Sequence, residues 1–119
     1  MKRMKKINSN EQIRKYIDLL LNSKFEIKKE KIFGVTCIMN NVFEDVYNTF
    51  QSITQLLLHE TEKLSKITKN DIQIFKEKLI SLLNLNNEIY WLKRNNITIE
   101  EYISNLNNIV KEIDFYFSN

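Results

Sequence analysis

The amino-acid sequence predicts an all-α protein, a helical bundle of about four helices organised on one long central helix. Apolar residues recur at steps of three and four over most of the 119 positions, which is the spacing of one face of an α-helix. Proline is absent and glycine occurs once, whereas β-sandwiches, barrels and α/β sheets need more turn residues than this chain has. The length fits a single domain covering residues 1–119.

The first helix is expected from about residue 10 to residue 22. Ser9 stands three positions before Gln12, the spacing of a capping box that satisfies free N–H groups at a helix start. Apolar residues then follow at helical spacing, namely Ile13, Tyr16, Ile17, Leu20 and Leu21. Residues 1–8, ahead of this helix, are expected to form a basic arm.

The longest helical pattern runs from Val35 to Ile67 and is the predicted central helix. Its apolar positions are Val35, Ile38, Met39, Val42, Val46, Phe50, Ile53, Leu57, Leu64 and Ile67. No proline or glycine interrupts them, and a helix of this length would extend about 50 Å.

In the preceding residues 23–34, Phe25 and Ile27 alternate with charges, as in a short edge strand. Because no second convincing strand offers a partner, a charged loop or the first turns of the central helix is the favoured interpretation.

Two segments of the same design mark the starts of the remaining helices. Each places a threonine three residues before an acidic residue, as Thr68 before Asp71 and Thr98 before Glu101, so that the two side chains can cap a helix. The third helix is expected to reach Arg94, with a kink or an end among three asparagines, which are poor helix-interior residues: Asn84, Asn86 and Asn87. The fourth helix continues at helical spacing through Tyr116 and Phe117.

The residue inventory argues against an enzyme, and no cofactor or metal is expected. One glycine cannot form a Walker or dinucleotide-binding loop. Cys37 and His59 are the only cysteine and histidine. A disulfide within the chain is therefore impossible, and the two residues alone are too few for a zinc site. A Cys-His or Ser-His-Asp catalytic arrangement would have to use His59, and we do not expect one. No run of about 18 apolar residues is present and no apolar stretch follows the first basic residues, so neither a membrane span nor a signal peptide is expected. A cytoplasmic location is the default expectation.

Basic residues concentrate in the first quarter of the chain. Residues 1–31 hold ten Lys or Arg and four Asp or Glu, whereas residues 32–119 hold eight and eleven. Nine of these cations are candidates for binding nucleic-acid phosphates or an acidic protein groove: Lys2, Arg3, Lys5, Lys6, Arg14, Lys15, Lys28, Lys29 and Lys31. The alternative is a solvated tail with a lysine-rich surface that reflects codon bias. Three arginines in the whole chain are few for a sequence-specific reader of DNA.

Two aromatic residues are candidates for an exposed protein contact. Trp91 and Phe115 fit the core spacing of their helices less well than Tyr116 and Phe117 do. The central helix is also apolar on more than one face around Leu56 and Leu58, which is compatible with a homodimer.

Two functions from different classes follow from these features. The favoured one is a small non-enzymatic module that docks on a larger protein or ribonucleoprotein and inhibits or modulates it. Compact helical inhibitors encoded by phages and mobile elements, anti-defence proteins among them, have this character. The alternative is a nucleic-acid-binding accessory protein that uses the basic N-terminal region.

A third possibility comes from the segment between Leu79 and Leu106. It contains a leucine-rich helix, an asparagine-rich turn and a helix opened by Thr98-x-x-Glu101-Tyr102. In these features it resembles the small basic helical immunity proteins that act against bacteriocins. The resemblance covers about a quarter of the chain, excludes the long central helix, and implies a bacteriocin-immunity-like bundle.

Overall fold

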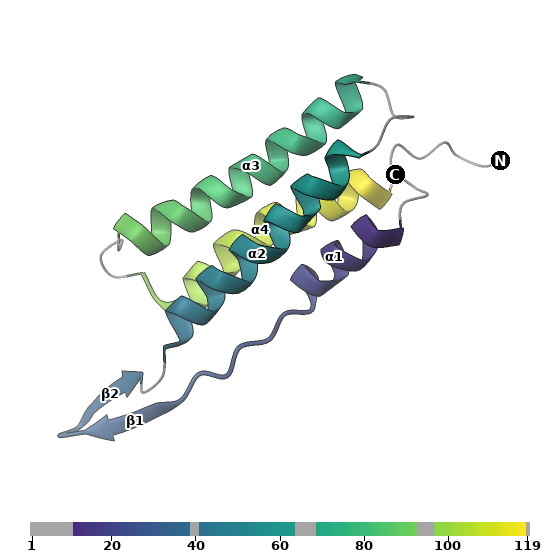
Figure 1. Cartoon of the computed structure of the whole chain (residues 1–119). Helices are drawn as coiled ribbons and strands as arrows, with labels where there is room; N and C mark the ends of the chain where they lie inside the picture. The colour runs from purple at the N-terminus through teal and green to yellow at the C-terminus, as the bar shows by residue number, and fades with distance from the viewer. Residues whose placement is uncertain (1–10, 39–40, 64–68, 93–96, 119) are drawn as a thin grey trace.

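The computed structural model describes residues 11–38, 41–63, 69–92 and 97–118. Within these residues the elements are α1 (Glu11–Leu21), β1 (Lys29–Ile32), β2 (Val35–Ile38), α2 (Val42–Glu62), α3 (Lys69–Leu92) and α4 (Ile99–Ser118). Four helices pack side by side, and the two short strands form a hairpin that projects from one end (Figure 1). The predicted all-α bundle is therefore confirmed, with a small two-stranded sheet added to it.

Helix α2 is the central helix of the bundle, because it packs against α1, α3 and α4. Its buried positions recur at helical spacing along one broad face and meet the buried faces of the other three helices. The hydrophobic core formed in this way contains Ile13, Ile17, Leu20, Val42, Val46, Phe50, Leu57, Phe75, Leu79, Leu82, Ile89, Ile99, Tyr102, Leu106, Val110 and Ile113.

The prediction of one helix from Val35 to Ile67 is wrong in its first part. Residues Val35–Ile38 form strand β2, which pairs antiparallel with β1, and α2 begins only at Val42. Consequently α2 has 21 residues and is shorter than α3, which has 24. Residues 39–40 and 64–67 of the predicted helix lie outside the described residues.

The turn at Phe33 and Gly34 explains why a hairpin forms where a helix was expected. Both residues have positive φ angles, 52° and 81°, which is the backbone of a type I′ two-residue turn. This turn matches the twist of paired strands, and the β-branched residues that follow it favour extended backbone. The edge-strand pattern noted in residues 23–34 therefore belongs to a hairpin whose second strand was hidden in the helical spacing.

Helix α3 also differs from its prediction, because it passes through its three asparagines without a break. Asn86 is buried and hydrogen-bonded, and Asn87 donates from Nδ2 to the carbonyl of Leu83 at 3.0 Å. Tertiary contacts thus outweigh the poor helix propensity of asparagine.

The capping box of α4 is confirmed: the Thr98 N–H donates to Glu101 Oε1 at 2.8 Å and the Glu101 N–H donates to Thr98 Oγ1 at 3.0 Å. The predicted first helix is confirmed as α1. The predicted capping residues Ser9 and Thr68 lie outside the described residues.

Candidate functional site

A buried polar network joins α2, α3 and α4. Asn86 of α3 donates from Nδ2 to the Tyr47 carbonyl at 3.0 Å and to Gln51 Oε1 at 3.1 Å, both on α2. Its Oδ1 accepts a 2.6 Å hydrogen bond from the hydroxyl of Tyr102 on α4. Both ends of the Asn86 amide are therefore satisfied in the core, which fixes how the three helices align.

Tyr47 extends this network to the surface. Its hydroxyl donates to Asn87 Oδ1 at 2.8 Å and accepts from Trp91 Nε1 at 3.0 Å. The ring of Tyr47 stacks on Tyr90, with centroids 4.3 Å apart, and meets Trp91 edge to face at 5.7 Å. Tyr90 and Trp91 also meet edge to face, at 5.0 Å. We refer to Tyr47, Tyr90 and Trp91 as the Trp91 cluster.

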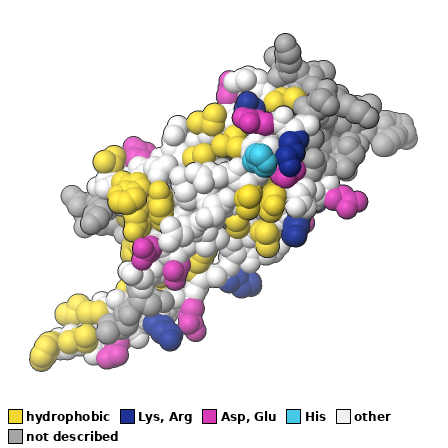
Figure 2. All heavy atoms as spheres, viewed as in Figure 1, with side chains coloured by type: hydrophobic (Ala, Val, Ile, Leu, Met, Phe, Trp, Pro, Cys, Tyr) yellow, Lys and Arg dark blue, Asp and Glu magenta, His cyan; other side chains and the backbone are white. Residues whose placement is uncertain are grey.

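The Trp91 cluster presents apolar surface to solvent. Trp91 is 62% exposed although its indole N–H and ring are held by neighbours, and Leu92 beside it is 70% exposed. Hydrophobic side chains gather over this end of α3 and over the projecting hairpin (Figure 2). The structure thus shows Trp91 exposed, as expected, and its contact with a partner stays a prediction. The contribution of Tyr47 was not visible in the sequence.

The β1–β2 hairpin is a second exposed element, and we refer to Lys29–Ile38 as the hairpin arm. Neither strand packs against any of the described helices. Ile32, Val35 and Ile38 are exposed, and Phe33 at the tip is 100% exposed. An ion pair between Lys29 Nζ and Glu100 Oε2, at 3.4 Å, connects the base of the arm to the start of α4.

The basic candidates do not form one patch in the described part of the chain. Arg14 donates two hydrogen bonds to Asp18 Oδ1, at 2.8 and 3.1 Å, and also pairs with Asp114 of α4. Partial burial alone would lower the pKa of Arg14, but the hydrogen bonds to Asp114 and Asp18 outweigh it and raise the pKa. Arg14 is therefore committed to joining α1 and α4, which makes it a poor phosphate ligand.

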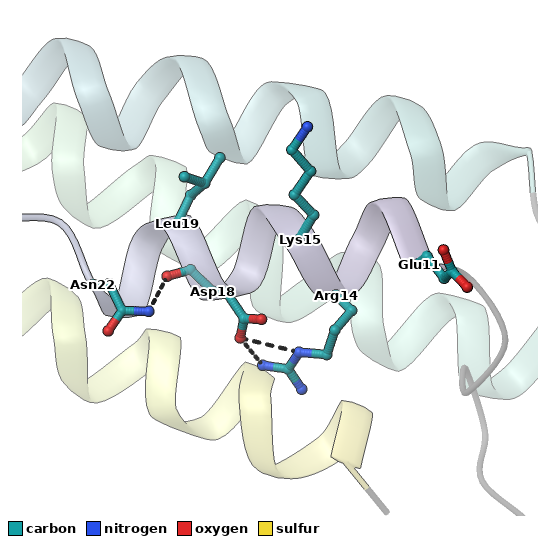
Figure 3. Close-up of a pocket in the computed structure, with 6 residues that line it drawn as sticks. All are labelled: Glu11, Arg14, Lys15, Asp18, Leu19 and Asn22. Carbon is teal, nitrogen blue, oxygen red and sulfur yellow. Dashed lines mark hydrogen bonds and ion pairs between the residues drawn. The ribbon is translucent and has the colours of Figure 1, made fainter.

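Lys15 lies in a shallow groove along α1 that Glu11, Arg14, Asp18, Leu19 and Asn22 also line (Figure 3). In this view Lys15 and Leu19 point to one side of α1, whereas Arg14 and Asp18 point toward the other. Lys28, Lys29 and Lys31 are exposed at or near the hairpin arm, apart from α1. The candidates Lys2, Arg3, Lys5 and Lys6 lie outside the described residues.

Phe115 is 71% exposed, but it lies far from the Trp91 cluster. It borders a shallow pocket on α3 and α4 together with Lys78, Lys111 and Glu112. Lys78 and Trp91 are separated by about 20 Å of helix, so the two candidate aromatics belong to different ends of the bundle. On α2, Leu56 is exposed whereas Leu58 is half-buried against the core.

The described residues contain no group of three or more His, Cys, Asp or Glu side chains placed to hold a metal ion. His59 is exposed. Within the part of the chain that the structure describes, no helix is both long and apolar enough to cross a membrane.

No protein-family model matches the chain, and no match was found among curated proteins or solved structures.

Proposed function

We propose that the protein is a non-enzymatic module that docks on a larger protein through the Trp91 cluster and thereby inhibits or modulates that partner. The observation that carries the proposal is the state of Trp91, which is largely exposed yet fixed by a hydrogen bond and two ring contacts. Tryptophan and tyrosine are the side chains that most often dominate the energy of protein interfaces.

The fixed position of Trp91 favours binding for an entropic reason. Ordering a flexible side chain at an interface opposes association by about 0.5–1.5 kcal/mol. The hydrogen bond to Tyr47 and the edge-to-face packing already restrict the Trp91 indole, so less freedom is left to lose on docking. Leu92, which is 70% exposed, adds apolar area next to it.

Binding of nucleic acid through the basic residues has weaker support. Arg14 is paired with two carboxylates and Lys29 with Glu100. A phosphate would have to compete with these internal partners, and electrostatic attraction to DNA depends on cations that can release counterions. Nucleic-acid binding is therefore the competing outcome of the experiment below.

The test is affinity capture of a partner by the tagged 119-residue chain from a lysate of the organism that encodes it, run both with and without nuclease. We expect a stoichiometric protein partner with the wild type and at least a tenfold loss with Trp91→Ala. Phe115→Ala is the matched control, because it truncates a similarly exposed aromatic at the other end of the bundle and should retain the partner.

Tyr47→Phe refines the test, since it removes only the hydroxyl that accepts from Trp91 and donates to Asn87. Its capture should fall between those of the wild type and Trp91→Ala. Circular dichroism must show that each variant keeps the helical content of the wild type. Equal capture by Trp91→Ala and the wild type would refute the proposal, as would recovery of nucleic acid alone that is lost on digestion.

A further inference from the structure

The two strands of the hairpin arm differ in how well their free edges are protected. Natural proteins guard an open sheet edge with charges, with proline or by covering it, since unpaired N–H and C=O groups recruit other strands. Strand β1, Lys29–Ile32, carries three charged residues in four, whereas β2, Val35–Ile38, carries none. Neither strand is covered by a described helix. Among the residues that the structure describes, β2 therefore has an unpaired outer edge, and the strand carries no charge.

The register shows which backbone groups this edge offers. In a hairpin with a two-residue turn, the residues flanking the turn form a hydrogen-bonded pair, here Ile32 and Val35. Pairs alternate along the ladder, so Glu30 with Cys37 is also hydrogen-bonded, while Thr36 and Ile38 direct their backbone groups to the outer edge. The backbone N–H and C=O groups of Thr36 and Ile38 can therefore form hydrogen bonds with another strand.

We propose that β2 pairs antiparallel with β2 of a second copy of this chain across a twofold axis, making a four-stranded sheet with the two β1 strands outermost. Two uncharged edges meet without like-charge repulsion, which the same pairing through β1 would face. The assembly stops at two copies because only the charged β1 edges remain open.

The pairing also accounts for two features that oppose the stability of the isolated hairpin. A two-stranded hairpin is marginal in water, whereas a sheet of four strands with an apolar face is not. Ile32, Val35 and Cys37 point to one face of the hairpin, with Glu30 opposite Cys37 at its base, and a twofold axis perpendicular to the sheet joins this face to its copy. The fully exposed Phe33 then lies beside the base of the partner hairpin, since antiparallel strands set tip against base.

The test measures mass in solution by sedimentation over protein concentrations from about 1 µM to about 1 mM, because so short an edge gives a weak dimer. We expect the wild-type mass to rise with concentration from 14.4 kDa toward twice that value. Thr36→Pro should raise the dissociation constant more than tenfold, since it removes an outward N–H but no hydrogen bond to β1. Lys31→Pro is the matched control: it lies opposite Thr36, and its N–H faces the outer edge of β1.

A second measurement locates the contact, using Cys37 as the only cysteine in the chain. Its side chain leaves the sheet plane, so a nitroxide label there spares the paired edge, and two labels on neighbouring strands should give an interspin distance below about 25 Å. A wild type that stays monomeric throughout, as it would if the strand of another protein were the true occupant, overturns the proposal. The proposal is also overturned if Thr36→Pro dimerises like the wild type, or if Lys31→Pro weakens the dimer as much as Thr36→Pro does. A dimer that is lost in Leu56→Glu and shows no short distance between the labels would place the contact on α2 instead, and would overturn the proposal as well.

Discussion

Replacing Tyr102 by phenylalanine isolates the contribution of one buried hydrogen bond. Tyr102 is fully buried, stacks on Phe43 with ring centroids 6.0 Å apart, and donates its hydroxyl proton to Asn86 Oδ1. The phenylalanine ring keeps the stacking but leaves the Asn86 oxygen without this donor inside the core. An unsatisfied buried polar group costs about 1–3 kcal/mol, so we expect the free energy of unfolding to fall by about 2 kcal/mol.

Urea unfolding followed by circular dichroism measures this difference. Tyr16→Phe is the matched control, because the Tyr16 hydroxyl only accepts a 3.4 Å bond from Gln12 at an exposed site and its loss should change stability by less than about 0.5 kcal/mol. A double-mutant cycle of Tyr102→Phe with Asn86→Leu should give a coupling energy of about 1 kcal/mol or more. A Tyr102→Phe protein as stable as the wild type would refute the claim that the hydrogen bond from Tyr102 to Asn86 stabilises the core.

Three further predictions concern the capping box, the α1–α4 ion pair and alkaline pH. Thr98→Ala should destabilise the protein by about 1 kcal/mol because the Glu101 N–H loses its acceptor, and Thr98→Ser should restore stability in the same urea assay. Asp114→Ala should lower the free energy of unfolding by less than about 1 kcal/mol, because the Arg14 pair is partly exposed, and high salt should shrink the difference. Burial, with smaller effects of Tyr47 and Tyr90, raises the pKa of Tyr102 above its ordinary value of 10.0, so the folded protein binds this proton more tightly than the unfolded chain does. The stability linked to it is complete below pH 10.0 and declines as the pH rises beyond that value; unfolding measured at stepwise alkaline pH should therefore show a steeper decline for the wild type than for Tyr102→Phe.

The helices were predictable because each depends on a local pattern. The apolar spacing of α1 and the Thr98–Glu101 box of α4 involve residues within one or two turns, and the structure confirms both. The hairpin was missed for a local reason as well. Val35 and Ile38 continue the three-and-four spacing of α2 backwards, while the usual hairpin signal, Asn-Gly, is replaced by Phe33-Gly34, whose phenylalanine is an unusual residue at positive φ.

The candidate site depended on contacts that the sequence could not show. The exposure of Trp91 followed from its place outside the core spacing, but its hydrogen bond to Tyr47 joins residues on different helices. Arg14 was a candidate for phosphate binding because Asp114, one of its two partners, stands at the other end of the chain; the other partner, Asp18, is only four residues away. Asn86 was expected to kink or end its helix, because its hydrogen-bond partners stand on α2 and α4 and come close to it only in the folded chain.

The core network and the Trp91 cluster share Tyr47, and this connects stability with the proposed binding. The Tyr47 carbonyl accepts from the buried Asn86, and the Tyr47 hydroxyl accepts from the exposed Trp91. A chain of hydrogen bonds, with Tyr47 as its middle member, therefore runs from Tyr102 in the core to Trp91 at the surface.

If this chain restricts the motion of the indole, Tyr102→Phe should make Trp91 more mobile. Because Trp91 is the only tryptophan in the sequence, its fluorescence reports this motion directly. We expect a lower fluorescence anisotropy and faster quenching by acrylamide in Tyr102→Phe under native conditions, with Tyr16→Phe unchanged. An unchanged signal in Tyr102→Phe would show that Trp91 is held by its ring contacts alone, and that its readiness to bind is a property of the surface cluster rather than of the core.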